Sequence, residues 1–166
     1  MDKVFKIVLV GPAGSGKTSL IKRLTTGKFS EKYITTTAPE ETSITFSTNM
    51  GNVTFKVWDC PRGGHFDLAN KKYYCGSHGC IILLDHHTSN QKMLPKRYIE
   101  EYKSACPKSP FVMWSGKGDI DSQYNVRPVS SLTGEGVTKP FTELARCLIS
   151  DDIIMGDVIK SQPKTK

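Results

Sequence analysis

The segment Gly11–Thr18 (GPAGSGKT) has residue types and spacing suited to phosphate chemistry. It fits the pattern G-x-x-x-x-G-K-[ST], in which glycines let backbone N–H groups curl around phosphate oxygens. The helix that follows such a loop adds the positive end of its dipole. Lys17 would reach the β- and γ-phosphates, and the Thr18 hydroxyl would ligate Mg²⁺. The predicted phosphate site comprises Gly11, Ala13, Gly14, Ser15, Gly16, Lys17 and Thr18.

A second group of polar residues follows an alternating apolar run. Asp59 ends the run Val53–Asp59, and the loop Cys60–His65 (CPRGGH) comes directly after it. An aspartate at this point is a common turn residue, and it could equally belong to a ligand-sensing loop. The run predicts that Asp59 lies at the end of a strand.

The elements that must position these residues alternate between strand and helix patterns. Short apolar or alternating runs predict strands, and 3.6-residue periodicity predicts helices. Asn49–Asn52 reads as the turn of a β-hairpin. The predicted strands are 4–10, 44–46, 53–57, 80–84, 111–114 and 126–129, and the predicted helices are 18–26, 93–105 and 141–149. This order predicts an α/β fold, with a mostly parallel six-stranded sheet flanked by helices and one antiparallel hairpin at its edge.

Length and charge limit the remaining possibilities. A chain of 166 residues favours one domain, which we place at residues 1–152, with residues 153–166 as a flexible tail. The net charge of +7 is compatible with an acidic partner, but the basic residues are scattered, so we predict no nucleic-acid partner. No apolar run is long enough to cross a bilayer, and the chain ends without a prenylation motif. We expect a monomer with reduced thiols and no membrane anchor.

Several stretches beyond the phosphate motif resemble small GTPases of the Ras superfamily, and the Ran subfamily in particular. They are TGKFSEKYITTT (26–37), FSTNMGNVTFKVWD (46–59), KKYYCGSHGCIILLDHHTS (71–89) and KPFTELARCLI (139–149). The resemblance covers most of residues 3–151. It implies the small G domain of P-loop NTPases and a switch that binds GTP and GDP with Mg²⁺. It also implies nuclear transport receptors or Ran regulators as partners, in the nucleus and cytoplasm.

The same resemblance implies roles for individual residues. Phe29 would lie against the guanine ring, and Thr36 would bind Mg²⁺ and sense the γ-phosphate. Asp59 would hold Mg²⁺ through water. Lys117 and Asp119 would flank the base, and a carboxylate at Asp119 accepts the two donors that guanine offers. The backbone of Ser130, Ser131 and Leu132 would meet the guanine oxygen.

The chain departs from the family pattern at four places. Gly116 stands where the family has an asparagine that bonds the base and ties this loop to the phosphate loop. Arg62 replaces a glycine that meets the γ-phosphate, and Gly63 replaces the glutamine that orients the attacking water. Ala13 replaces a glycine of the phosphate loop. The segment between Asp119 and Ser130 is too short for the helix that precedes the last strand. We therefore predict weakened nucleotide binding and slow or absent GTP hydrolysis, with no catalytic residue assigned.

Three alternatives stay open. His65 could position the water if the loop after Asp59 is aligned with the D-C-P-G-H loop of translation-factor GTPases. The chain could instead be a pseudo-GTPase that engages Ran-type transport partners without a nucleotide cycle. A nucleoside or nucleotide kinase would need a lid with converging arginines, and the arginines here are widely separated.

Overall fold

The computed structural model describes residues 2–29, 38–60, 71–85, 94–117 and 126–163, apart from the side chains of residues 85, 94 and 117. The strands are β1 Lys3–Val10, β2 Glu40–Thr48, β3 Val53–Asp59, β4 Gly79–Asp85, β5 Phe111–Lys117, β6 Arg127–Pro128 and β7 Met155–Pro163. The helices are α1 Lys17–Thr26, α3 Leu94–Ala105 and α4 Lys139–Leu148. Residues 71–74 form a further helical turn.

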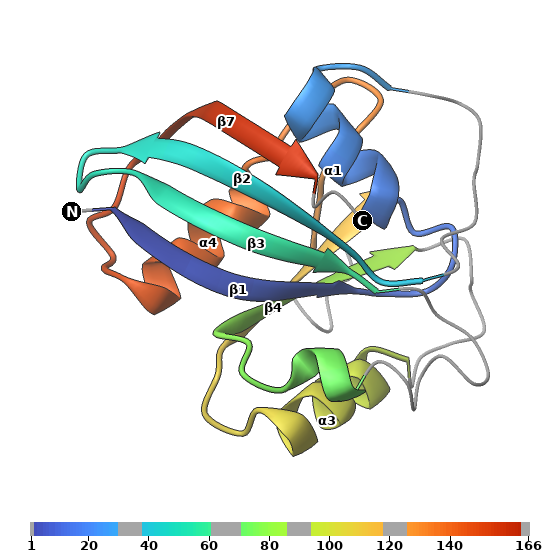
Figure 1. The fold of residues 1–166 in the computed structure, drawn as a ribbon. Helices are drawn as coiled ribbons and strands as arrows, with labels where there is room; N and C mark the ends of the chain where they lie inside the picture. Colours follow the sequence, from blue (N-terminus) through green and yellow to red (C-terminus); the bar gives the residue numbers. More distant parts are fainter. Residues whose placement is uncertain (1, 30–37, 61–70, 86–93, 118–125, 164–166) are drawn as a thin grey trace.

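The strands form one sheet in the order β6-β5-β4-β1-β3-β2-β7 (Figure 1). Strands β6, β5, β4, β1 and β3 are mutually parallel, whereas β2 runs antiparallel to both of its neighbours. This arrangement confirms the predicted α/β fold, its mostly parallel sheet and the hairpin of β2 and β3. The sheet has seven strands rather than the predicted six.

The additional strand is β7, which lies where the sequence predicts a flexible tail over residues 153–166, and that prediction is wrong for residues 155–163. β7 pairs antiparallel with β2, from Thr42 opposite Pro163 to Thr48 opposite Met155. The pairing register shifts twice along this pair. As a result, the two β7 side chains that pack on the core, Met155 and Val158, are three residues apart instead of two or four. The bulged pairing hides the period-two signal by which a strand is recognised.

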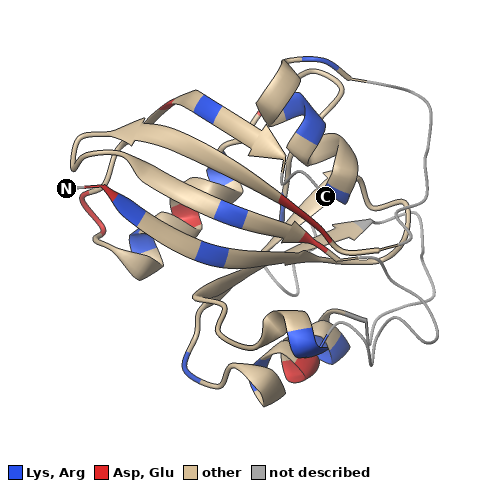
Figure 2. Ribbon diagram, viewed as in Figure 1, with Lys and Arg blue, Asp and Glu red and all other residues tan. Residues whose placement is uncertain are grey.

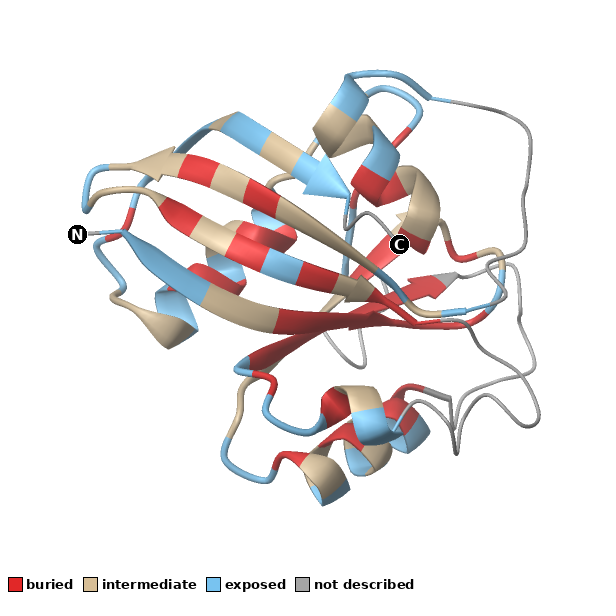
Figure 3. Cartoon of the chain, viewed as in Figure 1, coloured by how far each residue is buried: buried red, intermediate tan, exposed pale blue. Residues whose placement is uncertain are grey.

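One face of the sheet is covered by α1 and α4 (Figures 1 and 3). Leu20 and Ile21 of α1 and Phe141 of α4 are buried there with the inward side chains of β2 and β3. The rings of Phe46, Phe55 and Phe141 have centroids 5.6 to 6.0 Å apart. The strands β2 and β3 alternate between buried and less buried residues, as a sheet covered on one face requires.

The opposite face, over β4 and β5, packs against α3. Buried Tyr102 of α3 packs edge to face on Tyr74 and hydrogen-bonds the Ser77 hydroxyl at 2.9 Å. The Cys106 thiol donates to the Tyr74 carbonyl at 2.9 Å. These contacts hold residues 74–77 against the carboxyl-terminal end of α3 and Cys106, which follows it.

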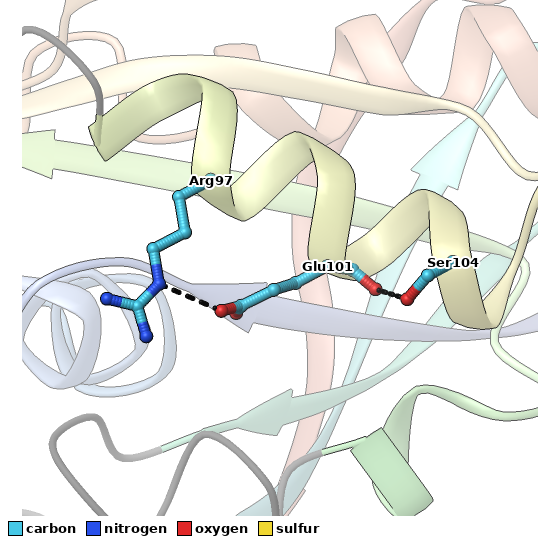
Figure 4. Close-up of polar contacts among 3 residues, drawn as sticks. All are labelled: Arg97, Glu101 and Ser104. Atoms are coloured by element: carbon cyan, nitrogen blue, oxygen red, sulfur yellow. Dashed lines mark hydrogen bonds and ion pairs between the residues drawn. The ribbon is translucent and has the colours of Figure 1, made fainter.

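The outer side of α3 carries an Arg97–Glu101 pair at 3.0 Å, and Ser104 Oγ donates to the Glu101 carbonyl at 2.7 Å (Figure 4). Both contacts are exposed, so they add little to stability. Lysine and arginine lie on β1, β3, β7 and the helices alike (Figure 2). No helix within the described ranges is long and apolar enough to span a membrane.

Candidate functional site

Except for Phe29, which follows α1, the predicted site residues that the structure describes lie near the carboxyl ends of the parallel strands. The phosphate loop, residues Gly11–Thr18, follows β1, and Asp59 is the last residue of the adjacent β3. Lys117 is the last residue of β5, and Ser130 and Ser131 follow β6. The carboxyl ends of parallel strands are the usual ligand site of open α/β sheets.

The phosphate loop has the backbone shape that its glycines permit. Gly14 and Gly16 have φ of 78° and 95°, in the region that other residues rarely adopt. A Cβ at Gly11 would overlap the Leu83 carbonyl oxygen of β4, so only glycine fits there. Ala13 lies exposed on the loop. The predicted loop is therefore present between β1 and α1, and its Ala13 methyl group faces outward.

The amino terminus of α1 is suited to an anion. Gly16 is the N-cap and supplies no side-chain hydrogen bond, and the first turn contains no acidic residue. Side-chain oxygens or carboxylates would otherwise compete with a ligand for the first N–H groups of the helix. α1 ends at Gly27, whose N–H donates to the Arg23 carbonyl at 3.0 Å.

Lys17 is buried at 7% exposure, and its ammonium group lies over the phosphate loop. Lys17 Nζ donates to the Gly11 carbonyl at 2.8 Å and to the Pro12 carbonyl at 3.1 Å. The charge of Lys17 acts on the nearby Asp59 carboxyl, whose pKa it lowers. An anionic ligand enclosed by the loop would meet the same positive charge.

The two predicted Mg²⁺ ligands that the structure describes are in direct contact. Thr18 Oγ1 donates to Asp59 Oδ2 at 2.6 Å. The other carboxylate oxygen, Asp59 Oδ1, is buried and has no hydrogen-bond partner among the described residues. Mg²⁺ prefers oxygen ligands and keeps several waters, so a hydroxyl and a carboxylate oxygen with no protein partner are donors of the kind it takes. The residues present therefore fit the ion.

The pKa of the Asp59 carboxyl is shifted by its burial and by the charges around it. Burial raises the pKa of the Asp59 carboxyl, and the negative charge of Glu40 adds to this rise. The Thr18 hydrogen bond and the charge of Lys17 lower the pKa in part. A divalent cation would favour the ionised carboxylate and so reverse the effect of burial.

Cys60 follows Asp59 and was not singled out by its sequence. The thiol is buried, and burial together with the Asp59 charge raises its pKa to about 12. A thiol in this state is protonated at neutral pH and is a poor nucleophile. Cys60 therefore contributes to the core cluster that contains Val8, Val10 and Tyr74 rather than to chemistry at the site.

The residues predicted to meet the base, Ser130–Leu132, lie in a closed turn, residues 130–135, which we call the base loop. Gly134 N donates to the Ser130 carbonyl at 2.7 Å, and Ser130 N donates to the Glu135 carbonyl at 2.9 Å. Ser131 is buried, whereas Leu132 is 62% exposed. On the other predicted wall, Phe29 is 36% exposed. Leu132 and Phe29 thus each keep an exposed apolar side chain.

Sequence reasoning missed the residue that joins the base loop to α1. Arg23 Nη2 donates to the Thr133 carbonyl at 3.1 Å, across 110 residues of sequence. Arg23 is one of several basic residues in α1, and no local pattern distinguishes it from Lys22. Only the three-dimensional fold identifies it as a support of the base loop.

Other predicted residues fall outside the described part of the chain. They are Thr36, Arg62, Gly63, His65 and Asp119, together with residues 118–125, which include most of the segment between Asp119 and Ser130 that is predicted to be too short for a helix. For Lys117 the structure gives the backbone alone, at the end of β5. The roles predicted for these residues stay predictions.

A family of known proteins matches most of the chain. Residues 6–119 match the family described as Roc, Ras of Complex, domain of DAPkinase. The matched region includes the phosphate loop, the Thr18–Asp59 pair, and the Lys117 and Asp119 positions, and it ends before the base loop.

Proposed function

Because the chain belongs to the Roc family of Ras-like GTPase domains, we propose that it is a molecular switch that binds GTP and GDP with Mg²⁺. The observation that carries this proposal is the Thr18–Asp59 hydrogen bond at the end of the phosphate loop, with Asp59 Oδ1 buried and unpaired among the described residues. A hydroxyl and a carboxylate in contact beside an anion-binding loop are what a magnesium nucleotide requires.

Each group of residues has its own role in nucleotide binding. Backbone N–H groups of the phosphate loop and of the amino terminus of α1 donate hydrogen bonds to the phosphates, and Lys17 neutralises their charge. Thr18 and Asp59 hold the metal, which when bound neutralises charge on the β- and γ-phosphates. The base loop and Phe29 enclose the base, with guanine selected by Asp119. Thr36 completes the metal and γ-phosphate contacts in this proposal.

We propose further that GTP is hydrolysed slowly or not at all. Gly63 has no side chain to orient an attacking water, and Arg62 replaces the glycine that meets the γ-phosphate. Ala13 adds a methyl group on the exposed side of the phosphate loop, where a water or an incoming arginine would approach. His65 remains a candidate for positioning water, and His65→Ala with unchanged turnover would exclude it.

The partner proposal rests on the resemblance to Ran. We propose that nuclear transport receptors or Ran regulators recognise the chain, and that it acts in the nucleus and cytoplasm. Binding of a purified transport receptor to the GTP-loaded chain, but not to the GDP-loaded chain, is the expected result. Equal binding in both states would favour a partner-binding module without a switch.

Nucleotide identity tests the proposal. The nucleotide released from the purified chain by denaturation should be GDP or GTP, and single-turnover hydrolysis of bound GTP should be slower than in a typical small GTPase. Bound GTP that persists indicates a locked state, whereas GDP indicates a cycle. Release of no nucleotide, with no binding of added GTP, would make the pseudo-GTPase the correct alternative. Release of adenine nucleotide would contradict both.

A further inference from the structure

Gly116 lies against the phosphate loop at the end of β5. A Cβ added to Gly116 would overlap the Ser15 carbonyl oxygen and would approach the Ser15 carbonyl carbon and Leu83 Cδ2, each at 3.1 Å. A Cβ added to Gly16 would lie 3.9 Å from the Gly116 carbonyl oxygen. The backbones of the phosphate loop and β5 are therefore packed together with no room for a side chain between them.

The obstacle at Gly116 is rigid. The overlapping atom belongs to the backbone of a loop whose neighbours Gly14 and Gly16 are fixed in left-handed conformations. Ser15 itself is fully buried, and its N–H donates to the Pro12 carbonyl at 3.1 Å. A side chain at position 116 could not be accommodated by the rotation of a flexible neighbour. It would have to move the Ser15 peptide, and with it the N–H groups that face the phosphates.

We propose that Gly116 is a positioning residue for the phosphate loop, because only a residue without a side chain lets Ser15 take its place against β5. The replacement of the family's asparagine is then more than the loss of an amide that bonds the base. The loop occupies the space that the amide would need, so restoring asparagine would damage the phosphate site. This inference rests on the proposed nucleotide site and assigns to Gly116 a role on its phosphate side.

The two interpretations of Gly116 predict opposite results. If Gly116 only lacks a base-binding amide, Gly116→Asn strengthens GDP binding and leaves a base-free ligand unaffected. If Gly116 positions Ser15, then Gly116→Ala and Gly116→Asn both weaken binding of a base-free ligand. Inorganic triphosphate with Mg²⁺ is the suitable probe, because it occupies the phosphate side alone.

The experiment measures triphosphate and GDP affinity for the wild-type chain, both Gly116 variants and the control Gly76→Ala. Gly76 has a positive φ of 74°, which Gly116 does not, so alanine strains its backbone, but an added Cβ there meets nothing within 4 Å. We expect Gly116→Ala to lose triphosphate affinity by on the order of 10- to 100-fold, and Gly76→Ala to keep it. Tighter GDP binding by Gly116→Asn, or unchanged triphosphate binding by Gly116→Ala, would overturn the proposal.

A second readout separates this inference from the proposed function. Hydrogen exchange of the amides of residues 11–18 in the nucleotide-free chain should accelerate in Gly116→Ala, whether or not the wild-type chain binds nucleotide. Unchanged exchange would overturn the inference even if GTP binds. If the variants do not fold, a measurement on the wild-type chain still tests the proposed packing. A nuclear Overhauser effect between the Gly116 α-protons and the Ser15–Gly16 peptide is expected, and its absence would contradict the packing on which the inference depends.

Discussion

The Thr18 hydroxyl donates a 2.6 Å hydrogen bond to Asp59 Oδ2, and this contact joins the first turn of α1 to the end of β3. The contact brings together two residues that are 41 positions apart in the sequence. It joins the two described residues that we propose hold Mg²⁺, and it leaves Asp59 Oδ1 buried without a partner in the described structure. Several expectations depend on this pair.

Asp59→Asn should separate folding from metal binding. The amide keeps an oxygen that can accept the Thr18 hydrogen bond, but it removes a buried charge. Thermal unfolding without ligand should therefore show an unchanged or raised stability. Mg²⁺ affinity of the nucleotide complex should fall by on the order of 10- to 100-fold, as when groups that hold a metal through its outer shell are removed. A variant that keeps full Mg²⁺ affinity would exclude Asp59 from the metal site.

The raised pKa of Asp59 predicts a dependence of stability on pH with a definite sign. Between the ordinary carboxyl pKa of about 3.9 and its raised value, the folded chain holds a proton that the unfolded chain has released. Without Mg²⁺, this contribution to stability is fully present below the ordinary pKa and is lost as the pH rises through the raised one. Mg²⁺ requires the carboxylate, so Mg²⁺ affinity should instead increase with pH. Both trends should be absent from Asp59→Asn, and trends of equal size in that variant would assign them to another group.

Arg23→Ala should loosen the base loop. The Arg23 bond to the Thr133 carbonyl is exposed, and its loss should cost about 0.5–1.5 kcal/mol. If this free-energy cost destabilises the nucleotide-bound state and leaves the transition state for release unchanged, GDP dissociation should accelerate roughly 2- to 10-fold. Stopped-flow release of a fluorescent GDP analogue measures this rate. Arg146→Ala, which removes an equal charge from the last turn of α4, is the control. Equal rates in the two variants would show that charge, not the Thr133 contact, matters.

Val158→Asp and Ile159→Asp form a matched pair for β7. Val158 packs on the core opposite Phe46, whereas Ile159 is 54% exposed. Val158→Asp should lower the free energy of unfolding by about 2 kcal/mol, and Ile159→Asp should change it by about 0.5 kcal/mol or less. Chemical denaturation measures both. Equal effects would restore the interpretation of these residues as a flexible tail.

Thiol labelling tests the packing around the site. Cys75 and Cys147 are exposed, whereas Cys60, Cys80 and Cys106 are buried. Burial holds the pKa of Cys60 at about 12 and that of Cys80 well above its usual value. Ellman's reagent should therefore modify two thiols in the native chain and five after denaturation. Rapid native modification of Cys60, identified by mass spectrometry, would mean that the end of β3 is open.

The sequence predicted those parts of the fold whose signals are local. The glycine pattern around Lys17 predicted the phosphate loop, and the alternation of Val53, Phe55 and Val57 predicted a strand that ends at Asp59. Strand β7 was missed because its register shifts move Met155 and Val158 out of a period-two pattern. This strand shows that a bulged edge can look like a polar tail.

In the candidate site, too, only the features with a local sequence pattern could be predicted. The Thr18–Asp59 pair could be predicted, because both residues belong to recognisable local patterns. The Arg23–Thr133 hydrogen bond could not be predicted, because no local pattern at either residue indicates a partner 110 residues away. The close packing of Gly116 against the phosphate loop could not be predicted either, since it depends on where the Ser15 carbonyl lies in space. Close approach between distant segments carries no local signal.

The most direct test of the central claim is a calorimetric titration of nucleotide-stripped protein with GDP in the presence of Mg²⁺. We expect saturable one-to-one binding that weakens when Mg²⁺ is removed, that is much weaker for ADP, and that is abolished by Lys17→Ala in a chain that remains folded. Binding of ADP as tight as GDP would contradict the guanine switch, and binding that survives Lys17→Ala undiminished would contradict the site.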